Sequence, residues 1–130
     1  MSASPTPPSD APFKSRSGLR RILNATSYSA DGLQAAWRSE HAFRQEIWLA
    51  GPLVLFACLV DVNAVGRALM IASVLLVLVI ELLNSAIEAI VDRVSPELHT
   101  LSKRAKDMGS AAVFLGIVNV IAVWVIVLGA

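Results

Sequence analysis

The chain has 130 residues, of which 55% are hydrophobic and 16% are charged, and its mean hydropathy is +0.64. Soluble globular domains average about 45–50% apolar and about 25% charged residues, so this balance argues against a soluble domain and against a disordered chain. The length allows one domain, and the single cysteine, Cys58, excludes a disulfide framework and a cysteine metal cluster. A net charge of +1 gives no sign of a nucleic-acid partner.

The N-terminal part of the chain divides into a tail and a helix. Residues 1–17 hold four prolines among Ser, Ala and Thr, which predicts a disordered tail and does not match a cleavable signal peptide. From about 18 to 38, apolar residues recur on one helical face and basic residues occupy much of the rest. A basic amphipathic helix beside a membrane span usually lies in the interface, although packing on a partner protein is an alternative.

Three segments without charge predict three transmembrane helices. The 23 residues of 108–130 carry no charge, which exceeds the about 20 residues needed to cross a hydrocarbon core. The segments 47–60 and 68–80 are shorter and cross only if polar residues enter the membrane at one end. The fold class is therefore an all-α membrane protein with an interfacial helix. The expected spans are about 42–60, 64–91 and 108–129.

The basic residues predict the orientation of these spans. Ten of the eleven lie before the first span or between the second and third, and only Arg67 lies between the first and second. The positive-inside rule then places the N-terminus and the loop at 93–107 in the cytoplasm and the C-terminus outside. The segment 61–63 reads as a turn, in which Asn63 is expected to cap the second span.

The second predicted span carries acids where a lipid-facing helix would not. At 100° per residue, Glu81, Asn84 and Glu88 fall on one stripe, which Ser85 and Asp92 continue. A carboxylate inside a span costs roughly 2.5–3.5 kcal/mol on insertion scales and is by default a functional-site hypothesis. The alternative is a polar seam that joins helices, although such seams rarely contain three acids.

Carboxylates on one stripe also suggest a hard cation. Mg²⁺ takes carboxylate oxygens and completes its shell with waters and substrate phosphates, and Glu40 or Glu46 would lie at the depth of Glu88. The basic run 103–107, just before the third span, is either a simple membrane anchor or a phosphate site beside the acids. No Walker A sequence and no GxGxxG are present.

Several strings resemble a known family. Residues 81–93 (ELLNSAIEAIVDR) and 105–113 (AKDMGSAAV) closely resemble the signature of the prokaryotic diacylglycerol kinase family. Residues 35–37 (AAW) and 40–46 (EHAFRQE) match as well. The resemblance covers roughly Gly18 to the C-terminus, and its departures lie mostly in the surface helix and at 94–103.

The resemblance implies a homotrimeric kinase of the bacterial inner membrane with sites shared between subunits. It would transfer the γ-phosphate of ATP, with Mg²⁺, to sn-1,2-diacylglycerol and give phosphatidic acid. The implied catalytic residues are Glu81, as general base, and Asn84. The implied metal ligands are Glu40 and Glu88. The implied nucleotide-binding residues are Arg21, Tyr28, Glu40, Glu88, Glu97, His99, Lys106 and Asp107. The implied substrate-binding residues are Arg21, Ser29, Gln45, Glu46, Glu81 and Ser110.

Two other functions remain open at this point. Some related family members phosphorylate undecaprenol, and nothing in the spacing of the residues distinguishes the two lipids. A non-catalytic transporter or assembly subunit would use the polar stripe to line a path or an interface. Phosphorylation of a lipid by the purified protein would exclude that class.

Overall fold

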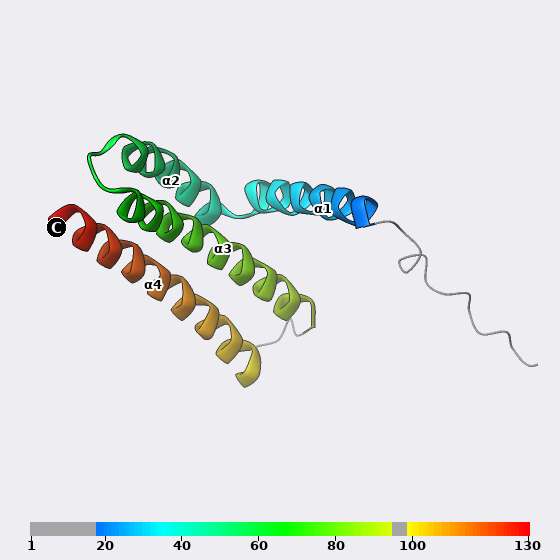
Figure 1. Cartoon of the computed structure of the whole chain (residues 1–130). Coiled ribbons are helices and arrows are strands. Elements are labelled where there is room, and N and C mark those ends of the chain that lie inside the picture. The colour runs from blue at the N-terminus through cyan, green and yellow to red at the C-terminus, as the bar shows by residue number, and fades with distance from the viewer. Residues whose placement is uncertain (1–17, 95–98) are drawn as a thin grey trace, which may run out of the picture. The chain divides into compact units, whose positions relative to one another are not determined.

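The computed structural model describes residues 18–94 and 99–130, which form four α-helices and no strand (Figure 1). This confirms the all-α fold class. The expected tail at 1–17 lies outside the described residues, as do residues 95–98 of the expected loop at 93–107. The helices are α1 (Gly18–Ser39), α2 (His41–Leu59), α3 (Ala64–Val94) and α4 (Thr100–Gly129).

The chain divides into two compact units, residues 1–35 and 36–130. The described part of the first unit is helical and belongs to α1. Its apolar residues Leu19, Ile22 and Leu23 are exposed, so the apolar face of this amphipathic helix is uncovered within the described part of the chain.

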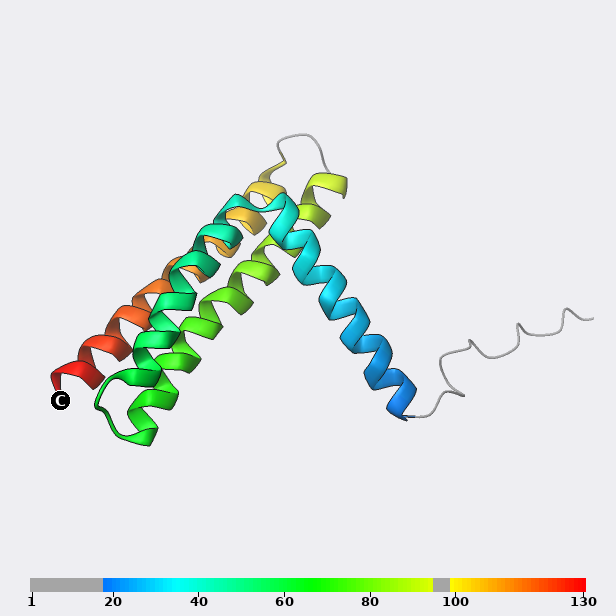
Figure 2. The ribbon, with the colours of Figure 1, turned by 90° about the horizontal axis from the view of Figure 1, so that it is seen from above.

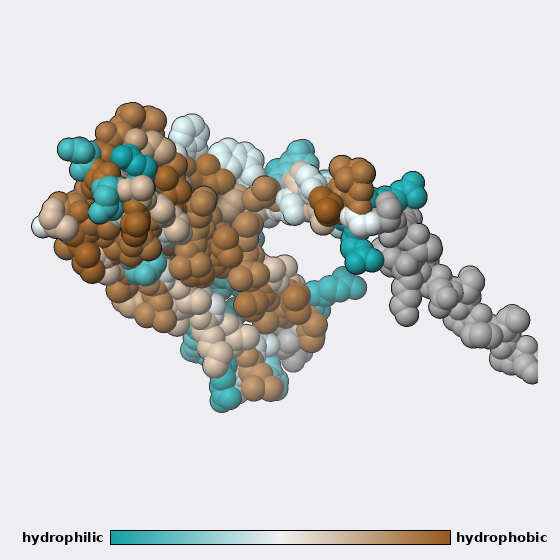
Figure 3. Space-filling model, viewed as in Figure 1, coloured by the Kyte–Doolittle hydropathy of each residue, from teal (hydrophilic) through white to brown (hydrophobic). Residues whose placement is uncertain are grey.

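Helices α2, α3 and α4 make up the second unit, in which α3 packs against both α2 and α4 (Figures 1 and 2). All three are long and apolar enough to cross a membrane, as the fold class requires. The space-filling view shows apolar side chains over these helices and hydrophilic ones mostly toward their ends (Figure 3). At 1.5 Å per residue, α3 and α4 exceed the about 30 Å of a hydrocarbon core, so their polar ends extend beyond it as helix.

Glycines allow α3 and α4 to approach closely. A Cβ atom added at Gly116 of α4 would lie 3.0 Å from Ile80 Cδ1, and one at Gly66 of α3 would lie 2.9 Å from Val127 Cγ1. Small residues at such a seam bring helix backbones together in a membrane, where van der Waals packing drives association. Trp124 Nε1 also donates a hydrogen bond of 3.3 Å to the carbonyl of the fully buried Met70.

The turn between α2 and α3 is held by side chains that satisfy helix ends. Asn63 Oδ1 accepts a 2.7 Å hydrogen bond from Gly66 N, which confirms Asn63 as the N-cap of α3. Arg67 Nη1 donates to the carbonyls of Ala57 (2.8 Å) and Cys58 (2.6 Å), the last turn of α2. Arg67, the one basic residue between the first and second predicted spans, therefore serves as a C-terminal cap of α2, where a positive charge and helix carbonyls attract each other.

Replacing Arg67 by Ala is expected to lower the free energy of unfolding by about 1.5–3 kcal/mol, the range for hydrogen bonds to a charged group. Thermal unfolding of the protein in detergent, followed by circular dichroism, measures this loss. Arg67→Lys keeps the positive charge but lacks the several N–H donors of the guanidinium group. Its stability should lie between those of the unmodified protein and Arg67→Ala. The matched control is Arg93→Ala at the other end of α3, and equal melting of the two Ala variants would contradict the cap.

Candidate active site

The middle of the polar stripe of α3 faces the interior of the bundle. Glu81 is 6% exposed and Asn84 is 8% exposed, while Glu88, one turn farther along, is half-buried. A buried carboxylate needs a partner or a proton, because removing its charge from water is costly. The stripe is therefore internal at Glu81 and Asn84, where α3 contacts α2 and α4 through Glu46 and Gly109, and it becomes exposed toward Asp92.

Glutamates from α2 and its N-terminal end converge on Glu81. The carboxyl groups of Glu46 and Glu81 interact directly between α2 and α3, and Glu40 and Glu88 lie close enough to repel Glu81. Glu40 occupies the N-cap position of α2, although its side chain makes no capping hydrogen bond. Glu46 Oε2 is buried without a hydrogen-bond partner among the described atoms. The structure thus brings Glu46 to Glu81, where the sequence placed it only at the depth of Glu88.

The described residues contain no ready-made metal cage around this cluster. Within residues 18–94 and 99–130, no three Asp, Glu, His or Cys side chains are arranged to bind a metal ion unaided. Mg²⁺ does not require such a cage, because one or two carboxylates together with phosphates and waters commonly suffice. Glu40 and Glu88, the two predicted metal ligands, both carry hard carboxylate oxygens and both lie close enough to Glu81 to affect it electrostatically.

Basic residues of α4 meet the acidic end of α3. Lys106 Nζ forms a 2.6 Å ion pair with Asp92 and interacts electrostatically with Glu88. Asp107 pairs with Lys103, one turn earlier in α4, at 2.6 Å. Asp92 was on the predicted stripe but not among the candidate site residues. The basic run at 103–107 contains its partner, Lys106, but the sequence does not indicate which acid pairs with which base.

Asn84 connects the stripe to α4. Its Nδ2 donates a 3.4 Å hydrogen bond to Glu88 Oε1, and its Oδ1 is buried with no partner among the described atoms. The side chain lies against Gly109 of α4, which has no side chain to displace it. Gly109 is not among the predicted site residues, because a glycine carries no functional group that would mark it in the sequence.

The remaining predicted residues are spread over the described chain. His99 is the N-cap of α4, and its Nδ1 accepts a 3.1 Å hydrogen bond from Leu101 N. Gln45 and Ser110 are exposed on α2 and α4. Glu97 lies outside the described residues. The residues expected on α1, all of them exposed and in the first unit, are Arg21, Tyr28 and Ser29.

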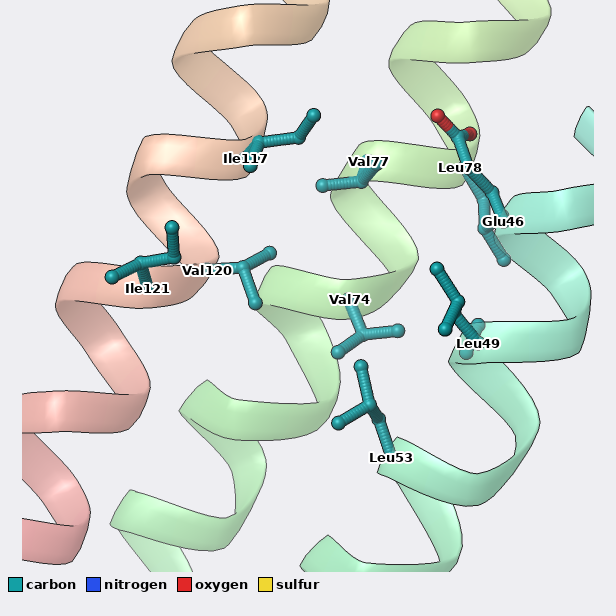
Figure 4. A pocket seen from close by; sticks show the side chains of 10 residues that line it. Glu46, Leu49, Leu53, Val74, Val77, Leu78, Ile117, Val120 and Ile121 are labelled. Atoms are coloured by element: carbon teal, nitrogen blue, oxygen red, sulfur yellow. The ribbon is translucent and has the colours of Figure 1, made fainter. Parts of the chain in front are cut away.

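An apolar groove of about 230 Å³ begins at Glu46, in the glutamate cluster, and runs along the bundle between α2, α3 and α4 (Figure 4). Glu46 is the one acidic or basic residue among its lining side chains, and the rest are aliphatic. One turn beyond the groove, Phe56 of α2 and Trp124 of α4 stack with ring centroids 6.0 Å apart. The lining residues are Glu46, Leu49, Ala50 and Leu53 of α2, Val74, Val77 and Leu78 of α3, and Ile117, Val120 and Ile121 of α4.

Comparisons with known proteins agree on one family. The family described as prokaryotic diacylglycerol kinase matches residues 27–128. A diacylglycerol kinase of Pseudomonas aeruginosa is 57% identical over 92% of this chain and 98% of its own length. One of Escherichia coli K12 is 53% identical over 85% and 91%, and one of Helicobacter pylori is 40% identical over 82% and 84%. Because the family match spans most of the chain and these relatives are so similar over nearly their whole length, the chain belongs to the prokaryotic diacylglycerol kinase family and is an enzyme, a lipid kinase.

Proposed function

We propose that this enzyme transfers the γ-phosphate of ATP to the hydroxyl of sn-1,2-diacylglycerol, giving phosphatidic acid and ADP. The observation that carries the proposal is the contact between Glu46 and Glu81, because Glu46 also lines the apolar groove. A groove with aliphatic walls and an acceptor oxygen at one end suits a molecule with a hydrocarbon chain and a hydroxyl group. Diacylglycerol is such a molecule, and the names of the similar proteins support it as the substrate.

In this proposal Glu81 is the general base. Its carboxylate accepts the proton of the lipid hydroxyl while the hydroxyl oxygen forms a bond to the γ-phosphorus and the bond to ADP breaks. Glu46 has a free buried oxygen and orients the hydroxyl by accepting a hydrogen bond. Asn84 donates to Glu88 and so holds that carboxylate in place.

The nucleotide would bind at the polar ends of α3 and α4. Lys106 contacts its phosphates after exchanging Asp92 for them, and Asp107 lies one residue further along α4. Glu40 and Glu88 would hold Mg²⁺, which would supply positive charge to the triphosphate. The other residues that we assign to ATP are Arg21, Tyr28, Glu97 and His99. Those that we assign to the lipid, besides Glu46 and Glu81, are Arg21, Ser29, Gln45 and Ser110.

We propose a homotrimer in the bacterial inner membrane, with the N-terminus and the site on the cytoplasmic side. The distribution of Lys and Arg supports this orientation. The trimer is supported by how little of each span is buried within one chain, since only 6% of the apolar window of α4 is covered. Neighbouring subunits would cover more of these helices and enclose the site.

The full-length protein, purified in detergent, is expected to transfer labelled phosphate from ATP to diacylglycerol in mixed micelles. Undecaprenol, tested in parallel at the same mole fraction, is expected to be the poorer acceptor. Thin-layer chromatography of the labelled lipids distinguishes the two products. Preference for undecaprenol would replace the proposed substrate within the same family, and labelling of neither lipid would contradict the proposal.

A further inference from the structure

The contact between Gly109 of α4 and Asn84 of α3 is closer than any side chain at position 109 would allow. A Cβ atom added to Gly109 would overlap Asn84 Oδ1 and lie 3.1 Å from its Cγ. The third nearest atom, Asn84 Cβ at 3.9 Å, belongs to the same residue. Gly109 therefore forms the wall against which the amide of Asn84 rests.

The amide of Asn84 has little freedom to move away from that wall. It is 8% exposed, and its Nδ2 reaches Glu88 Oε1 at 3.4 Å on the same face of α3. Its Oδ1 is buried without a partner among the described atoms, so this conformation is held by packing rather than by a second hydrogen bond. A methyl group at position 109 would push the amide off Glu88 or separate the two helices.

We propose that Gly109 is a positioning residue for phosphoryl transfer, which acts by holding the Asn84 amide against Glu88. The proposal rests on the function proposed above. Displacing a group of a reacting site by about 1 Å can cost about 100-fold in rate. The effect of a side chain at position 109 should therefore fall on kcat rather than on the stability of the bundle alone.

Gly116 provides a matched control on the same seam. It lies two turns further along α4, and an added Cβ would be 3.0 Å from Ile80 Cδ1, the flexible end of an apolar side chain. Gly109→Ala is expected to lower kcat about 100-fold with KM for ATP and lipid within about threefold of the original. Gly116→Ala should lower the melting temperature by about as much as Gly109→Ala does, but its kcat should equal that of the unmodified enzyme. Equal losses of kcat in the two variants, or no loss in Gly109→Ala, would overturn the proposal.

A double-mutant cycle keeps the test valid if Gly109→Ala alone does not fold. The clash is with the Asn84 side chain. The double variant Gly109→Ala/Asn84→Ala should therefore have the same melting temperature as Asn84→Ala alone. A double variant that melts well below Asn84→Ala, or that also fails to fold, would contradict the contact.

Nuclear magnetic resonance separates this proposal from the proposed function. The chain has four asparagines, and Asn84→Ala identifies the side-chain amide signals of Asn84 by their loss. These signals should shift in Gly109→Ala and stay in place in Gly116→Ala, whichever lipid the enzyme phosphorylates. Unshifted Asn84 signals in Gly109→Ala would overturn the inference, whereas a wild-type protein without kinase activity would overturn the proposed function.

Discussion

Replacing Glu81 by Gln is expected to lower kcat for lipid phosphorylation by about 10²–10⁴-fold, the usual contribution of a general base. Gln has nearly the same shape, but its amide cannot accept the proton of the attacking hydroxyl. The substitution also removes one buried carboxyl from the cluster of Glu40, Glu46, Glu81 and Glu88. Because it relieves repulsion among these acids, the bundle should remain folded. Initial rates with saturating ATP and diacylglycerol measure the loss, and the melting temperature reports the fold.

The matched control for Glu81→Gln is Asp61→Asn, which also changes an acid to its amide. Asp61 is exposed and lies in the turn between α2 and α3, away from the carboxylate cluster. Its kcat should remain that of the unmodified enzyme. A Glu81→Gln enzyme with full activity would disprove the assignment of the base, because no proton acceptor would remain at that position.

Replacing Glu88 by Gln is expected to lower activity by about 100-fold at a Mg²⁺ concentration that saturates the unmodified enzyme. The amide oxygen can still accept from Asn84, so the change removes the charge of the proposed metal ligand without removing the hydrogen bond. Raising Mg²⁺ should restore part of the rate. The measurement is the rate as a function of free Mg²⁺ at fixed ATP.

Asp92→Asn is the matched control for Glu88→Gln, since it lies one turn further along the same stripe. It breaks an ion pair with Lys106 whose side chains are both well exposed, so stability should change by about 0–1 kcal/mol. The midpoint of its Mg²⁺ dependence should not move. If both variants showed the same midpoint as the unmodified enzyme, Glu88 would not be a metal ligand.

The spans and the polar stripe could be predicted because each depends on one helix at a time. The absence of charge marks an apolar helix, and a 100° rotation per residue places Glu81, Asn84 and Glu88 together. The cap at Asn63 depends only on residues three positions apart and was equally accessible.

Contacts between helices were not accessible in this way. Periodicity assigns a residue to a face, but it does not set how far one helix slides along the next. That slide decides that Glu46 meets Glu81, that Lys106 meets Asp92 and that Gly109 meets Asn84. The cap made by Arg67 was hidden for the same reason, because its acceptors lie nine and ten residues away on another helix.

The aliphatic groove between α2, α3 and α4 lies within helices that are apolar over most of their length, so a lipid that fills it arrives from the bilayer rather than from water. The rate then depends on the mole fraction of substrate in the membrane, not on its molar concentration in solution. Diluting diacylglycerol with inert phospholipid would slow turnover even when the bulk amount is unchanged. The enzyme would thereby respond to the composition of its own membrane.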